Sequence, residues 1–187
     1  MKSLYALGLA AIFLFGSVAT AEEVMSGPKV GTGIAAFNVT KLCGAESDGI
    51  KAGNNLCYRC RNGARPQVMV FTRSTDAKVA DLVNKLDKAI MSNSDSQLRV
   101  FVNFMGENKD DIKSSVEKFA KSSKAKNIPF VLPNEHENGP DNYGINAKAE
   151  VTIVMANDSK VRASHAVAKV GDLDVDSVVK DLKKILK

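Results

Sequence analysis

The feature that most constrains the fold is a regular alternation of strand and helix patterns from Gln67 to the C-terminus. Apolar runs at Gln67–Thr72, Leu98–Met105 and Val151–Met155 have the length of buried strands. Between them, apolar residues recur at spacings of three and four, as they do on one face of a helix. Strands that alternate with helices predict a parallel sheet that is covered on both faces.

The same patterns predict the remaining elements. Helices are expected over Val79–Ile90, from Asp110 onward and over Asp172–Lys187, and further strands at Ile34–Val39, Ile128–Leu132 and Val161–Val170. Ser74 or Asp76 caps the first helix, and the last strand forms a hairpin with the strand before it. Lys41–Asn55 is predicted to be a long loop or a hairpin. The predicted class is α/β, with a central mixed sheet flanked by helices and a β-rich N-terminal extension.

The first 21 residues have the features of a signal peptide. Lys2 is followed by the apolar run Leu4–Gly16, which is too short to span a bilayer, and then by the small-residue pattern Ala19-Thr20-Ala21. A membrane anchor is the alternative, but acidic residues follow at once and no stop-transfer charges appear. We therefore predict an exported protein, periplasmic or secreted, with no membrane-spanning segment after cleavage.

Two segments are expected after the leader, an N-terminal extension at 22–64 and a main domain at 65–187. The formal net charge of +5 falls to +4 when Lys2 is removed. The lysines are scattered among acids and aromatic residues are few, which favours a solvated surface over a nucleic-acid partner. Nothing in the sequence indicates an oligomeric state.

A Cys-x-x-Cys motif, Cys57 and Cys60, carries the chemistry of the extension. A turn and a strand follow it, so we expect no helix start beside the pair. Arg59, Arg61 and Arg65 are the candidates to stabilise a thiolate there. Three alternatives stay open: thiol–disulfide exchange, a structural disulfide and a metal site.

Cys43 is the third cysteine, and export would place all three where disulfides persist. An odd number means that one thiol is free, pairs between chains or binds a ligand. Cys43 is a candidate resolving thiol. His165 could join the cysteines around copper or zinc, but an ordinary strand histidine is favoured, and we assign no metal ligand. Arg61 stands where covalent haem attachment needs histidine, and no other cofactor motif is found, so no cofactor is predicted.

The element order resembles the thioredoxin superfamily, and two segments strengthen the likeness. NGPDNYGI at 138–145 and EVTIVMANDSKV at 150–161 are similar to the thioredoxin stretch of Tyr-Gly-Ile, apolar strand and polar turn. The resemblance covers roughly Arg65 to the C-terminus. The long preface is similar to the redoxin and peroxiredoxin branch, and to exported bacterial proteins that carry the same Cys-Tyr-Arg-Cys motif.

The resemblance implies a thioredoxin-like fold and protein thiols or disulfides as partners, with two departures. Ser74-Thr75-Asp76-Ala77 stands where thioredoxins place their cysteine pair, and Val151 stands at their cis-proline. Neither thioredoxin's active-site pair nor its substrate-binding proline is therefore carried over by position. Thiol–disulfide exchange by Cys57 and Cys60 is the predicted activity. The alternatives are a non-catalytic binding or structural module with a locked disulfide, and a copper or zinc carrier.

Overall fold

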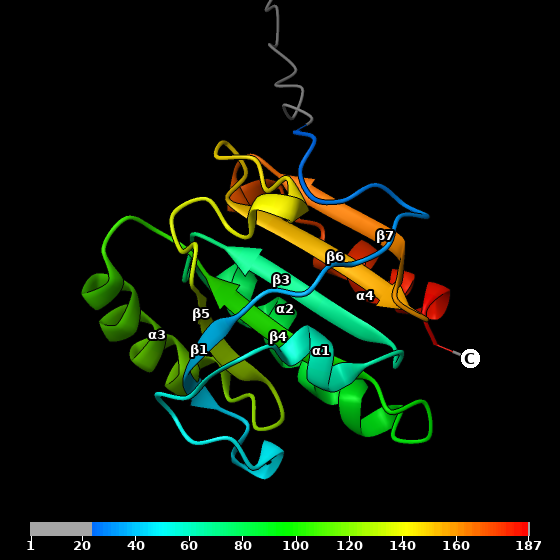
Figure 1. Cartoon of the computed structure of the whole chain (residues 1–187), viewed down its shortest axis with the longest axis horizontal. Helices are drawn as coiled ribbons and strands as arrows, with labels where there is room; N and C mark the ends of the chain where they lie inside the picture. The colour runs from blue at the N-terminus through cyan, green and yellow to red at the C-terminus, as the bar shows by residue number, and fades with distance from the viewer. Residues whose placement is uncertain (1–23, 187) are drawn as a thin grey trace, which may run out of the picture.

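The computed structural model describes residues 24–186, and the predicted signal peptide at 1–21 lies outside them. A seven-stranded mixed sheet runs through the described part in the order β2-β1-β5-β4-β3-β6-β7 (Figure 1). The strands are β1 (Val39–Gly44), β2 (Asn55–Leu56), β3 (Gln67–Thr72), β4 (Arg99–Phe104), β5 (Pro129–Pro133), β6 (Val151–Asn157) and β7 (Lys160–Val167). The helices are α1 (Tyr58–Asn62), α2 (Ala77–Ser92), α3 (Lys109–Ser123) and α4 (Val175–Asp181).

The centre of the sheet confirms the strands predicted from the apolar runs. β3 pairs in parallel with β4 and antiparallel with β6, and each of its six residues is buried. β6 and β7 form the expected hairpin, which ends the sheet on one side. Both faces of β3 are therefore covered, as its continuous apolar sequence requires.

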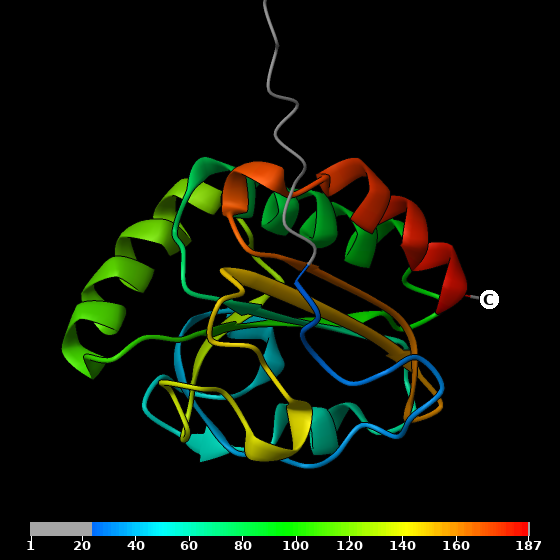
Figure 2. The same ribbon diagram turned by 90° about the horizontal axis from the view of Figure 1, so that it is seen from above.

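α2, α3 and α4 cover one face of the sheet, which we call the helix face (Figure 2). Asp76 caps α2 by accepting the backbone N–H of Lys78 at 2.8 Å, and Asn108 caps α3. The last helix is shorter than predicted from Asp172–Lys187, because Asp174 caps α4 and the chain tightens into a 3-10 turn at Leu182.

The opposite face, which we call the α1 face, is covered by α1, by the segment 24–38 and by the loop between β5 and β6 (Figures 1 and 2). The strand predicted at Ile34–Val39 is wrong in its extent, because backbone pairing of β1 starts only at Val39. Ile34 and Phe37 are buried against the sheet without belonging to it. An apolar pattern indicates that side chains are buried, but it does not show whether the backbone pairs with a strand of the sheet.

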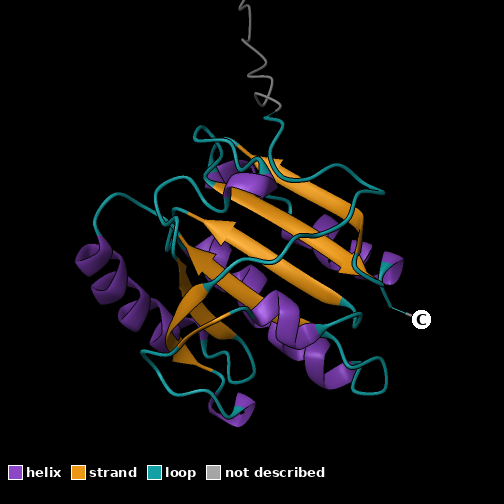
Figure 3. Ribbon diagram, viewed as in Figure 1, coloured by secondary structure: helices purple, strands orange, loops and turns teal. Residues whose placement is uncertain are grey.

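The N-terminal extension contributes β1 and β2, which form the edge of the sheet opposite β7. β1 pairs antiparallel with β5 and with the two-residue strand β2, so the hairpin alternative for this region was the correct one (Figure 3). The boundary between residues 64 and 65 stays a prediction. Within residues 24–186, no helix is both long enough and apolar enough to cross a membrane.

Candidate functional site

Cys57 and Cys60 form a disulfide at the start of α1, with their Cα atoms 5.2 Å apart. Cys57 is the N-cap of this five-residue helix, and its Sγ accepts the backbone N–H of Cys60 at 3.0 Å. Gly63 ends the helix with a φ of +63°, a conformation that favours glycine. The expectation that no helix starts beside the pair was therefore wrong.

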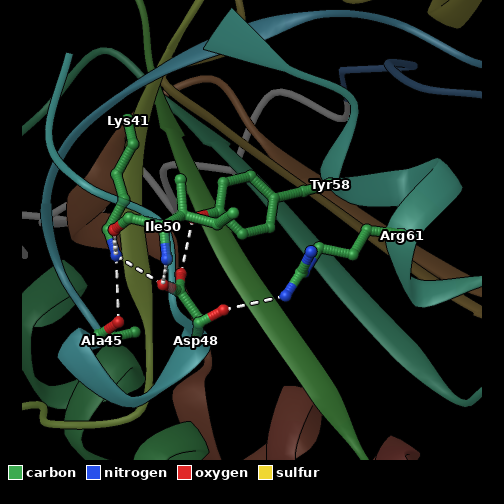
Figure 4. Close-up of polar contacts among 6 residues, drawn as sticks. All are labelled: Lys41, Ala45, Asp48, Ile50, Tyr58 and Arg61. Atoms are coloured by element: carbon green, nitrogen blue, oxygen red, sulfur yellow. Dashed lines mark hydrogen bonds and ion pairs between the residues drawn. The ribbon is translucent and has the colours of Figure 1, made fainter. Parts of the chain in front are cut away.

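Tyr58, between the two cysteines, fixes α1 on the sheet. Its side chain is only 4% exposed and its ring stacks on Phe101 of β4, with the centroids 5.7 Å apart. Its hydroxyl donates to Oδ2 of Asp48 at 2.6 Å (Figure 4). The two cysteines stay outside this core: Cys60 is exposed and Cys57 is half-buried.

Asp48 joins the loop after β1 to the helix that carries the disulfide. Its Oδ1 accepts Lys41 Nζ at 2.8 Å and the backbone N–H of Ile50 at 2.7 Å (Figure 4). Lys41 is 3% exposed and also donates to the carbonyl oxygens of Ala45 and Ile50. Burial alone would raise the pKa of Asp48, but the bonds from Lys41, Tyr58 and Ile50 outweigh it and lower that pKa.

Sequence patterns did not reveal this network, since Lys41 and Asp48 lie in a region without periodicity. The one available signal was Tyr58 itself, a large aromatic residue enclosed by two cysteines. Because the Tyr58 side chain is buried, it holds the Cys57–Cys60 pair in a fixed position on the sheet. The Tyr58–Asp48 bond also couples the disulfide to the buried lysine, so the site extends beyond the two sulfurs.

The three arginines predicted to stabilise a thiolate lie near the pair in different settings. Arg61 donates to the Asp48 backbone carbonyl at 2.9 Å. Arg65 donates to Gln97 Oε1 at 2.9 Å. The Nε of Arg59 is buried and has no hydrogen-bond partner among the described residues. The described contacts bring none of these guanidinium groups within hydrogen-bond distance of a sulfur.

Solved structures with a similar fold include several redox proteins. A proposed protein disulfide isomerase from Bacteroides thetaiotaomicron is 15% identical over 88% of this chain and 94% of its own, with a TM-score of 0.61. A proposed thiol:disulfide interchange protein DsbE from Chlorobium tepidum is 11% identical over 85% and 99%, with a TM-score of 0.62. Mycobacterium tuberculosis AhpC is 13% identical over 83% and 92%, also at 0.62.

The chain has a thioredoxin-like fold. The resemblance inferred from the sequence is therefore confirmed at the level of fold. Neither the protein-family models nor the curated proteins include a match to this sequence. In this chain the fold is a mixed sheet in which strand β3 is followed by helix α2, as the sequence pattern predicted.

The usual cysteine position of the thioredoxin-like fold lies on the other face of the sheet from Cys57 and Cys60. Asp76 and its neighbours follow the carboxyl end of β3 and begin α2 on the helix face. α1 lies on the α1 face and ends beside the amino end of β3, where Gln67 Nε2 donates to the Gly63 carbonyl at 3.2 Å. The pair is thus displaced from that position in space as well as in sequence.

Cys43 also lies on the helix face, where it packs against the core under α3. Burial and the nearby carboxylate of Glu117 raise the pKa of its thiol, and Lys41 opposes them only in part. The sheet separates this thiol from the Cys57–Cys60 disulfide. The structure therefore does not bring Cys43 to the pair as a resolving thiol.

The two histidines are occupied by other groups. His165 Nε2 lies 3.0 Å from Asp181 Oδ2, and His136 Nδ1 lies 2.7 Å from the Gly106 carbonyl. Across residues 24–186, no three His, Cys, Asp or Glu side chains gather closely enough to hold a metal ion. Each histidine therefore has a hydrogen-bond partner of its own.

Proposed function

We propose that this protein exchanges thiols and disulfides through Cys57 and Cys60, with protein thiols or disulfides as partners. The observation that carries the proposal is the position of the pair: an accessible disulfide whose Cys57 sulfur accepts a backbone N–H at a helix start. A donor aimed at sulfur favours the thiolate, which is the reactive form of cysteine.

In the reduced protein, the Cys57 thiolate attacks one sulfur of a substrate disulfide. A mixed disulfide forms between Cys57 and the substrate, and the first substrate thiolate leaves and takes up a proton. The thiolate of Cys60 then attacks Cys57 Sγ, so that the second substrate thiol leaves and the Cys57–Cys60 bond closes. Two electrons pass from the protein dithiol to the substrate, and the reverse sequence oxidises a substrate dithiol.

Arg59, Arg61 and Arg65 support this chemistry through their positive charge. Arg59 lies between the two cysteines in the chain, and Arg61 and Arg65 follow Cys60. A cation near a thiol lowers its pKa even without a direct bond. The names of the DsbE and disulfide isomerase neighbours describe those proteins, and they agree with the class of reaction proposed for this one.

A structural disulfide is the second candidate, and Tyr58 is the observation that favours it. The helix between the cysteines is anchored to the core through Phe101 and Asp48, so the disulfide could serve to fix α1. In that case the bond would resist mild reductants and the protein would have no exchange activity.

Insulin reduction and oxidative refolding of a reduced substrate protein test the proposal. Cys57→Ser should abolish both activities, whereas the matched variant Cys43→Ser, on the other face of the sheet, should keep them. Absence of activity in the unaltered protein, with a disulfide that mild reductant leaves closed, would favour the structural role.

We also propose that the chain is exported. The leader pattern ending at Ala21 and the closed disulfide support this, since disulfides persist in oxidising compartments. Mass spectrometry of protein from its host should find a chain that begins at Glu22. A soluble chain that retains Met1 would contradict export.

A further inference from the structure

A cavity of about 580 Å³ lies beside α1, and three arginines line it. Arg61 comes from α1, Arg65 from the turn that follows, and Arg99 is the first residue of β4. Leu98 and Pro129 add apolar wall. This volume is in the range of cavities that hold small molecules.

The three guanidinium groups bind only neutral acceptors within the described chain. Those acceptors are the Asp48 carbonyl for Arg61 at 2.9 Å, the Gln97 amide oxygen at 2.9 Å and the Arg61 carbonyl at 3.3 Å for Arg65, and the Leu98 carbonyl for Arg99 at 3.2 Å. The ion pairs formed within residues 24–186 include none of these arginines. Each guanidinium group has further N–H donors for another partner.

Asp48 is the one acidic residue among those lining the cavity, and its carboxylate is already engaged. Its oxygens accept Lys41 Nζ at 2.8 Å, the Ile50 N–H at 2.7 Å and the Tyr58 hydroxyl at 2.6 Å. Lys41 therefore compensates the charge of Asp48 (Figure 4). The positive charge of the cavity is left without a counterpart on its own wall.

The gathering of positive charge in this cavity affects the pKa of Arg99. Its partial burial, followed by the nearby charge of Arg65, lowers the pKa of its guanidinium group. Cations gathered in one concave site repel one another, and the repulsion is relieved when an anion enters.

We propose that this cavity binds a small molecule through an oxyanion group, a phosphate or a carboxylate, held by Arg61, Arg65 and Arg99. The planar guanidinium fork matches both groups with paired N–H donors. The apolar wall suits a ligand with a hydrocarbon portion. This inference does not depend on the exchange reaction, because the arginines would bind the anion in the oxidised protein, in which the disulfide is closed.

The test is calorimetric titration of the oxidised protein with inorganic phosphate and, separately, with succinate, at constant ionic strength and without reductant. At least one of the two should bind saturably, and the one that binds identifies the group. Arg99→Gln should weaken that binding by at least about tenfold, which corresponds to about 1.4 kcal/mol. Arg162→Gln, an exposed site on β7, is the matched control and should leave binding unchanged.

Two results would overturn the proposal. One is the absence of saturable binding for both anions. The other is equal weakening by Arg99→Gln and Arg162→Gln, which would reveal general attraction to a cationic surface. If Arg99→Gln fails to fold, Arg65→Gln takes its place, because that side chain is exposed and its loss leaves no buried gap. Since the disulfide stays closed, failure here would not bear on thiol exchange.

Discussion

The hydroxyl of Tyr58 gives the sharpest test of how α1 is held. Tyr58→Phe keeps the ring and its stack on Phe101 but removes the 2.6 Å hydrogen bond to Asp48 Oδ2. A hydrogen bond to a charged group contributes about 1.5–3 kcal/mol. For a chain of this length, a loss of about 2 kcal/mol lowers the unfolding midpoint by about 4–8 °C.

The effect should depend on pH. The pKa of Asp48 is lowered in the folded protein, so its bonds stabilise the fold above the ordinary carboxyl pKa of about 3.9. That stability is lost as the pH falls through the lowered value. The difference in free energy of unfolding between Tyr58→Phe and the unaltered protein should therefore shrink in acid.

Urea unfolding at pH 7 and at progressively lower pH measures both quantities. Tyr143→Phe is the matched control, because the Tyr143 hydroxyl donates to the neutral Ala35 carbonyl at 2.8 Å. It should cost only about 1 kcal/mol at every pH. Equal losses for the two variants, or a Tyr58→Phe loss that does not change with pH, would refute the role given to Asp48.

Three further changes test other parts of the structure. Lys41→Met should destabilise the protein by about 3 kcal/mol in urea unfolding, because it leaves Asp48 without its buried cation; an unchanged midpoint would contradict this. Gly44→Ala should cost at least about 2 kcal/mol by the same assay, since φ is +79° and a Cβ would lie 2.3 Å from the Ile128 carbonyl; a neutral result would show that the backbone yields there. Cys43→Ser should lower the thiol count of the oxidised protein from one to zero and leave exchange activity intact; lost activity would give Cys43 a redox role.

The central sheet could be predicted from sequence because its signals are local and repeated. The run Gln67–Thr72 was predicted with its bounds, and Asp76 was named as a cap of the following helix. A strand that is buried on both faces has a continuous apolar run, and an amphipathic helix has apolar residues at helical spacing. Both structures can therefore be recognised from the positions of their apolar residues. The thioredoxin-like order then follows from the alternation of elements.

α1 could not be predicted in the same way. Five residues are too few to show helical periodicity, and a helix so short is not stable alone. It depends on the disulfide, on the stack of Tyr58 over Phe101 and on the bond to Asp48, which are contacts between distant parts of the chain. The motif pointed to Cys57 and Cys60, but their setting needed the structure.

β1 was predicted only as one arm of a possible hairpin, without its bounds, for a related reason. Lys41, a charged residue, is buried in the middle of the strand, which breaks the expected alternation. Its charge is accepted by Asp48 and by two backbone carbonyls supplied by the loop that follows. A buried cation is stabilised by hydrogen-bond acceptors that the fold places around it, and sequence patterns do not show which residues supply them.

The reduction potential of the Cys57–Cys60 pair tests the proposed exchange most directly. In the proposed exchange, the N–H bond to Cys57 and the charges of Arg59, Arg61 and Arg65 would stabilise the thiolate, and this would raise the potential of the pair. Equilibration with glutathione buffers should place it well above the value of about −300 mV or lower that is typical of structural disulfides. A potential at or below that value, with the disulfide closed in mild reductant, would contradict an exchange function and leave the pair as a clamp on α1.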